Sequence, residues 1–103
     1  NGVTVNMLVD TGATTTVLTS GDAARAGIDV GRLSFTVPIM TANGPAKAAS
    51  AVVDEITIGE ISRGRLTVLV ASPSMLAQSL LGMNFINSLS GFDMRGDRLT
   101  LID

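Results

Sequence analysis

The feature that most constrains this chain is the segment 7–14, MLVDTGAT, in which an apolar run delivers a single carboxylate to a sharp turn. Apolar residues precede Asp10, and small residues follow it. An ionised carboxylate is costly to remove from water, and Asp is therefore rarely buried without a partner. We interpret Asp10 as a residue kept for function rather than for stability.

Composition excludes several kinds of chemistry. The chain has 103 residues, of which 46% are hydrophobic and 16% charged, so we expect one globular domain over residues 1–103. It contains no cysteine and no histidine, which removes disulfides, Cys-His and Ser-His catalysis, and nearly all zinc hydrolases. The net charge of −2 argues against a nucleic-acid or anionic-membrane partner. We expect no metal or other cofactor, and carboxylates remain as the acid–base candidates.

Hydrophobic patterning predicts a mostly β chain. Alternating and β-branched runs predict strands over 3–9, 14–18, 33–41, 46–58 and 61–71, and a final hairpin over 92–94 and 98–102. A short helix is predicted after an N-cap at Thr19 or Ser20, ending at Gly27. One or two further helical turns are predicted over 83–89, closed by Gly91. Many short strands separated by turns are typical of a small all-β barrel or sandwich.

Three motifs occur in a fixed order along the chain. The sequence D-T-G-A occupies 10–13, a hairpin with small residues near its tip spans 38–45, and L-L-G-M-N occupies 80–84. Together they resemble the retropepsin-type aspartic proteases, and most closely the bacterial single-domain members, which continue with Met-Asn-Phe and end in a Gly-Asp-Arg-Leu hairpin, as here. The resemblance covers nearly the whole chain. It implies a small closed β-barrel of the acid-protease type with one or two short helices.

The chemistry of this family explains why one carboxylate is not enough. Peptide hydrolysis without a metal or a nucleophilic side chain needs a water activated between a base and an acid. Two carboxylates a few ångströms apart share one proton, so that one acts as the base and the other as the acid. The sequence holds only one D-T-G, and an enzyme with both halves in one chain needs about three times this length. We therefore expect a symmetric homodimer that brings two copies of Asp10 together.

The resemblance also assigns roles to individual residues. Asp10, Thr11 and Gly12 are the expected catalytic residues, with Thr11 bonding across the dimer and Gly12 offering its carbonyl to the substrate. Leu81 and Gly82 are expected to support the Asp10 loop from below. The residues expected to bind an extended polypeptide substrate are Gly12, Ala13, Thr14, Val17, Met40, Thr41, Ala42, Asn43, Gly44 and Leu80, of which 40–44 form the flap.

One departure from the retroviral pattern concerns the support of this loop. The position after the Ala is usually acidic in that family and pairs with an Arg after the downstream Gly. Those positions are Thr14 and Met83 here, so we expect apolar contact to replace the ion pair. A cleft lined by Val17, Met40 and Leu80 predicts apolar substrate side chains on both sides of the cleaved bond.

Other interpretations of the same residues stay open. Asp10 could simply end a strand before a turn. The run D-T-G-A-T-T also resembles the phosphate loop of the actin and sugar-kinase group, although that fold needs two such domains. A third possibility is a catalytically idle dimer of the protease fold that binds peptides or acts as a scaffold.

The resemblance carries two expectations about the protein outside this segment. Asn1-Gly2 is typical of a hairpin turn, so we expect a strand upstream of it. Bacterial relatives are often tethered at the inner membrane by an N-terminal helix and face the periplasm. We therefore expect a periplasmic or inner-membrane-anchored protein. Separately, the shared proton of the carboxylate pair predicts an activity that is higher at acidic than at neutral pH, because rising pH removes that proton.

Overall fold

The structure is a computed structural model that describes residues 3–10, 12–41, 44–59, 61–95 and 98–102. Its strands are β1 (Met7–Val9), β2 (Val17–Leu18), β3 (Val37–Thr41), β4 (Gly44–Ile58), β5 (Ile61–Ala71), β6 (Ser79–Leu81), β7 (Gly91–Arg95) and β8 (Arg98–Ile102). Its helices are α1 (Ser20–Arg25) and α2 (Met83–Ile86), with a 3-10 turn η1 (Val30–Arg32).

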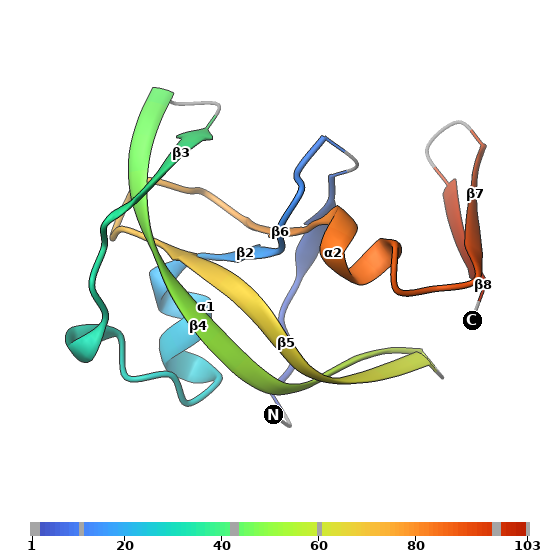
Figure 1. Ribbon diagram of the computed structural model, residues 1–103, viewed down its shortest axis with the longest axis horizontal. Helices are drawn as coiled ribbons and strands as arrows, with labels where there is room; N and C mark the ends of the chain where they lie inside the picture. The colour runs from blue at the N-terminus through green and yellow to red at the C-terminus, as the bar shows by residue number, and fades with distance from the viewer. Residues whose placement is uncertain (1–2, 11, 42–43, 60, 96–97, 103) are drawn as a thin grey trace.

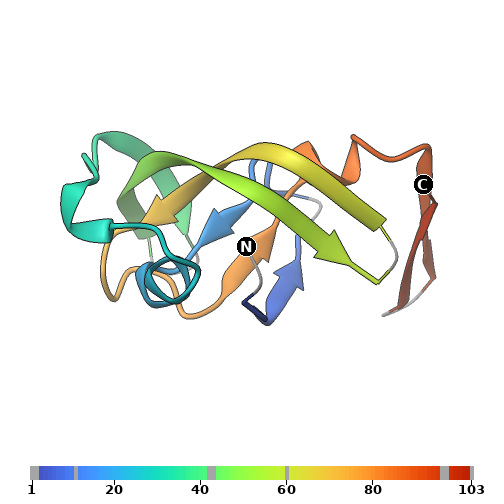
Figure 2. The same cartoon turned by 90° about the horizontal axis from the view of Figure 1, so that it is seen from below.

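A long antiparallel hairpin made by β4 and β5 forms the centre of the fold. It pairs from Ala48 opposite Ala71 to Ile58 opposite Ile61. Gly59 closes the turn with a φ of +60°, a conformation that glycine adopts without a steric penalty. Figures 1 and 2 show this hairpin as a twisted ribbon that arches over the rest of the molecule.

The main sheet has six strands in the order β1-β6-β2-β5-β4-β3. Strand β6 comes late in the sequence but lies between β1 and β2, parallel to β1 and antiparallel to β2. The sheet curls into a half-barrel, and β7 and β8 form a separate two-stranded sheet at one end (Figures 1 and 2). The predicted all-β fold of the retropepsin type, with one or two short helices, is confirmed.

Helix α1 begins and ends as its sequence predicts. The Thr19 hydroxyl accepts a hydrogen bond from the Asp22 N–H at 3.1 Å, as an N-cap should. Gly27 follows the helix with a φ of +93°, and the Ile28 N–H donates to the carbonyl of Ala23. No helix in the described part of the chain is long and apolar enough to cross a membrane.

Several element boundaries differ from the prediction. The first two strands are shorter than expected. In the segment predicted over 14–18, Thr14 and Thr16 bond to Asn84 after β6, and the Thr16 carbonyl accepts from the Leu69 N–H on β5. Strand β3 begins at Val37, after the unpredicted 3-10 turn. Helix α2 ends at Ile86, and Gly91 begins β7 rather than closing the helix. Pro38 lies on the edge strand β3, as expected, where its missing N–H disrupts least.

Two apolar clusters fill the space on the inner side of the sheet. One contains the buried residues Leu18, Ala23, Val53, Val68 and Val70, which join α1 to β2, β4 and β5. The other contains Leu81, Phe85 and Leu89, which join β6 to α2. Phe85 is 0% exposed and is the largest fully buried side chain. The second cluster therefore fixes α2 directly behind the end of β6.

We predict that Phe85→Ala lowers the free energy of unfolding by about 3–5 kcal/mol, because it leaves a large cavity in the second cluster. Phe92→Ala is the matched control, since Phe92 is 41% exposed and its removal should cost less than about 1.5 kcal/mol. Urea unfolding of both variants measures the difference, and equal losses would contradict this view of the core.

Candidate active site

Asp10 lies at the end of β1, in a loop that is fastened to β6. Its N–H donates to the carbonyl of Leu81 at 3.0 Å, which extends the pairing of β1 with β6 by one residue. The Asp10 carbonyl accepts from the Ala13 N–H at 3.1 Å, and its carboxylate accepts from the Gly12 N–H at 2.9 Å. The carboxylate is thus half-buried and held by its own turn.

The far side of the loop is fastened to the residues that follow β6. The Met83 N–H donates to the carbonyl of Ala13 at 2.8 Å, and the Asn84 N–H donates to the carbonyl of Thr14 at 3.1 Å. The loop that joins β1 to β2 therefore crosses over the end of β6, because β6 lies between those two strands. Of the two residues expected to support the loop, Leu81 accepts the Asp10 N–H through its carbonyl.

Gly82 lies where the two segments cross. A Cβ atom at this position would be 2.4 Å from the Thr15 carbonyl carbon, 2.5 Å from the Thr15 oxygen and 2.7 Å from the Thr16 nitrogen. The φ of Gly82 is −98°, so the backbone conformation does not require glycine here. The requirement is for space, since the loop backbone passes where a side chain would begin.

A buried polar network ties Thr16 to Asn84. The Asn84 amide oxygen accepts from the Thr16 N–H at 2.9 Å and from its hydroxyl at 2.8 Å. The same hydroxyl accepts from the Gly82 N–H at 3.1 Å, and the Asn84 amide nitrogen donates to the carbonyl of Thr67 at 2.8 Å. Thr16 is 0% exposed, so its N–H and its hydroxyl need the partners that Asn84 and Gly82 provide.

This network was not expected from the sequence. Apolar contact between Thr14 and Met83 stays a prediction, and the polar support that the structure shows is additional to it. It consists of main-chain hydrogen bonds from Met83 and Asn84 and of the Asn84 side chain. Asn84 was noted in the sequence only as part of a motif, because an isolated Asn after a Gly gives no sign of what it bonds to.

An apolar cleft of about 610 Å³ opens beside the Asp10 loop. Of the predicted substrate-binding residues, Gly12, Ala13, Thr14, Val17, Met40 and Leu80 line it together with Asp10. The prediction missed seven residues that line it as well: Leu8, Thr15, Val37, Pro38, Ile39, Leu69 and Leu76. Alternation along β3 could have suggested Val37 and Ile39, but Leu69 and Leu76 reach the cleft only through the fold.

The remaining predicted residues fall into two groups. Thr11, Ala42 and Asn43 lie outside the described residues. Thr41 ends β3 and Gly44 begins β4, and Gly44 is not among the residues that line the cleft. The side chain of Met40 is 76% exposed, so the cleft is open on the side of β3.

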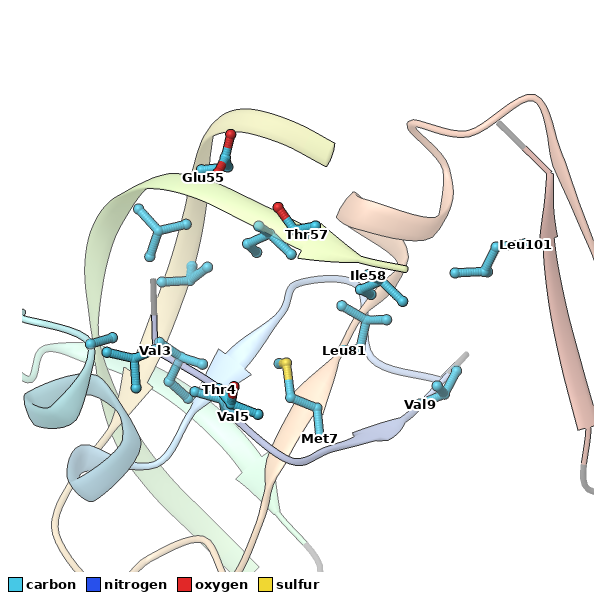
Figure 3. A pocket seen from close by; sticks show the side chains of 15 residues that line it. Val3, Thr4, Val5, Met7, Val9, Glu55, Thr57, Ile58, Leu81 and Leu101 are labelled. Atoms are coloured by element: carbon cyan, nitrogen blue, oxygen red, sulfur yellow. The ribbon is translucent and has the colours of Figure 1, made fainter. Parts of the chain in front are cut away.

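A larger hollow of about 670 Å³ lies away from Asp10. Figure 3 shows Met7, Ile58 and Leu81 around it, with the N-terminal segment at Val3 and Val5 along one side. Its lining is apolar, with Glu55 as the titratable group. The smaller cleft is the candidate active site despite its size, because it contains Asp10 and the loop contacts described above.

Comparison with known proteins agrees with this geometry. A family model described as "gag-polyprotein putative aspartyl protease" matches residues 1–88. A solved retropepsin-like aspartic protease from Rickettsia conorii is 35% identical with a TM-score of 0.81, over 94% of this chain and 72% of that one. The EIAV protease, solved with an inhibitor, is 26% identical with a TM-score of 0.66, over 88% and 82%.

Two uncharacterized proteins are similar in sequence. One, from Sinorhizobium sp., is 47% identical over all of this chain and 44% of its own length. The other, from Rickettsia prowazekii (strain Madrid E), is 33% identical over 98% of this chain and 43% of its own length. The chain thus spans less than half of either relative. It belongs to the retropepsin-like family of aspartyl proteases, as the resemblance of its motifs predicted.

We predict that Gly82→Ala lowers the free energy of unfolding by about 2 kcal/mol or more, because its Cβ would displace the loop backbone at Thr15. Gly21→Ala is the matched control. Nothing lies within 4 Å of a Cβ at Gly21, and alanine is favoured in a helix by about 0.5–1 kcal/mol. Thermal unfolding tests both, and a Gly82→Ala variant as stable as the parent would rule out the close crossing.

We predict that Asn84→Ala lowers the free energy of unfolding by about 2 kcal/mol or more, because it removes the acceptor of the Thr16 N–H and of the Thr16 hydroxyl proton. The stability of Asn84→Asp should lie between that of the parent and that of Asn84→Ala, since this variant keeps the acceptor for Thr16 and loses the donor to Thr67. The exposed Asn87 provides the control, with Asn87→Ala expected to change stability by less than about 0.5 kcal/mol. Denaturant titration of the three variants measures their free energies of unfolding, and a different order of stability would contradict the role given to Asn84.

Proposed function

We propose that this chain is one half of an aspartic endopeptidase, in which two Asp10 carboxylates from a homodimer activate a water that attacks a peptide bond. The observation that carries the proposal is the position of Asp10. Its carboxylate lines an apolar cleft, on a loop that is hydrogen-bonded at both ends to the segment 81–84. Membership of the aspartyl protease family supports the same chemistry.

The proposed mechanism uses one shared proton. Two carboxylates at the dimer axis cannot both ionise readily, so one accepts a proton from the attacking water while the other donates its proton to the carbonyl oxygen of the substrate. The pair then titrates as a unit. Loss of the shared proton at higher pH leaves two repelling carboxylates, which is why the activity should be higher at acidic than at neutral pH.

The proposed substrate is an extended polypeptide. It would lie in the cleft beneath the β3–β4 hairpin, which acts as a flap and adds main-chain hydrogen bonds. The aliphatic lining from Val17, Leu69, Leu76 and Leu80 favours apolar side chains on both sides of the cleaved bond. Catalytic roles for Thr11 and Gly12 belong to the same proposal and rest on the family resemblance.

We also propose that the full-length protein is held at the inner membrane by a segment upstream of this chain and faces the periplasm. This part of the proposal is supported by the resemblance to bacterial family members. Fractionation of cells that produce the tagged full-length protein tests it, and recovery in the cytoplasmic fraction would overturn it.

We predict that Asp10→Asn lowers the rate of peptide cleavage by about a thousandfold or more, because it removes both carboxylates of the pair. Cleavage of a peptide library between about pH 3 and 8 measures the rate, with sedimentation of each sample to report the dimer. Asp29→Asn is the control, since Asp29 lies on the surface in a pair with Arg32, and it should leave the rate unchanged.

The outcomes separate the alternatives. Loss of cleavage in a variant that still dimerises supports the shared-carboxylate mechanism. A well-formed dimer of the parent chain that cleaves nothing would favour the idle peptide-binding module. A rate that keeps rising above about pH 8 would contradict the shared proton.

A further inference from the structure

Ser79, the first residue of β6, joins the central part of the sheet to helix α1. Its side chain is 0% exposed. The Ser79 hydroxyl donates to the Asp22 carboxylate at 2.5 Å and accepts from the Thr19 N–H at 3.0 Å. This buried hydroxyl thus donates one hydrogen bond and accepts another, both with residues at the start of α1 that lie more than 50 positions away in the chain.

The other carboxylate oxygen of Asp22 is paired with Arg25 at 2.5 Å, and Arg25 also donates to the carbonyl of Thr4 at 3.3 Å. The hydrogen bonds from Ser79 and then from Arg25 lower the pKa of the Asp22 carboxyl below its ordinary value of 3.8, against the opposing effect of burial. The carboxylate therefore stays ionised further into the acidic range than an ordinary Asp.

Arg25 is the charged group that acts on this carboxylate within the described residues. Strands β2 and β6 carry no titratable side chain, and β4 and β5 join the cluster around Ala23 through Val53, Val68 and Val70. The charged residues of these two strands, Lys47, Asp54, Glu55, Arg63 and Arg65, are not part of that cluster. The charges of η1 and its flank, Asp29 and Arg32, pair with each other at 3.2 Å. Arg25 is thus the residue that forms an ion pair with Asp22.

Strand β6 is the element that holds the candidate active site. Leu80, the residue after Ser79, lines the cleft, and the carbonyl of Leu81 accepts the N–H of Asp10. The hydroxyl of Ser79 fixes the beginning of the same three-residue strand. A shift of β6 along its axis would move both the cleft wall and the anchor of the Asp10 loop.

We propose that Asp22 and Ser79 form a latch that positions β6 under the Asp10 loop, and that the ionised Asp22 keeps this latch closed at the acidic pH where the enzyme works. Asp22 is then a positioning residue, distant from the reacting atoms. The inference rests on the proposed aspartic peptidase function, but its structural part can be measured without any cleavage.

The direction of the pH dependence follows from linkage. A carboxyl whose pKa is lowered in the folded state contributes stability above its unfolded pKa and loses that contribution as the pH falls through the folded pKa. The latch of the parent protein is therefore complete above the ordinary value of 3.8 and opens only at a lower pH. A variant that lacks the charge has an equally weakened latch at every pH.

The test compares Asp22→Asn with Asp29→Asn. Both remove an acid that pairs with an Arg three residues later, but only Asp22 also bonds Ser79. Arg25→Gln is a second variant, which keeps the Ser79 bond and changes a side chain that is 55% exposed. It preserves a test of the proposal if Asp22→Asn does not fold.

Two readouts are taken between about pH 2.5 and 6: the kcat/KM for a peptide substrate, and the exchange rate of the Asp10 amide with solvent deuterium. We expect Asp22→Asn to lower kcat/KM about fivefold and to speed Asp10 exchange by a similar factor at pH 5–6. The ratio of parent to variant should fall toward one at the acidic end. For Arg25→Gln the acidic loss should begin at a higher pH, and Asp29→Asn should match the parent throughout.

The outcomes are distinguishable. Exchange and cleavage that are unchanged in Asp22→Asn and Arg25→Gln overturn the latch. A loss that is the same at every pH also overturns it, because a merely structural role of the side chain would not follow ionisation. If the parent protein cleaves nothing but Asp10 exchange responds as expected, the proposed function fails and the latch stands.

Discussion

The rest of this structure depends on one steric constraint, the crossing of the Asp10 loop over Gly82. Strand β6 lies between β1 and β2, so the connection between those two strands has to pass over its end. The backbones approach so closely that a Cβ at Gly82 would lie 2.4 Å from a carbonyl carbon. A glycine at this point lets main-chain hydrogen bonds, rather than side-chain packing, hold the loop at both ends.

Polar contacts between distant segments then fix β6 at both of its ends. After its last residue, the Asn84 side chain accepts hydrogen bonds from the Thr16 N–H and hydroxyl and donates one to the Thr67 carbonyl on β5. At its first residue, Ser79, the strand is fastened to α1 through Asp22. These groups are buried or partly buried and satisfied, so disrupting either end leaves unpaired polar atoms. A strand of three residues is in this way fixed at both ends, and it carries a wall of the cleft and the anchor of the Asp10 loop.

Local signals in the sequence predicted most of the elements but not their limits. The cap at Thr19, the glycine after α1 and the alternation along β4 and β5 act through neighbouring residues, and they were identified correctly. The strand predicted over 14–18 was too long, since its β-branched threonines favour extended structure while their hydrogen bonds go to 82–84. Tertiary contacts overruled the local preference there.

The sequence alone determined the family of this protein, through a lone D-T-G carboxylate and a downstream L-L-G-M-N in the order of an aspartyl protease, and the absence of cysteine and histidine limited the chemistry it could carry. These features consist of residue types and their order along the chain, so they are visible in the sequence without a structure. Only the tertiary structure decided what supports the loop, which side chains line the cleft and what holds β6. Asn84 with Thr16, Ser79 with Asp22, and Leu69 with Leu76 in one cleft are assignments of this kind. The physical reason is that such partners lie up to 68 positions apart, and only the order of strands in the sheet brings them together.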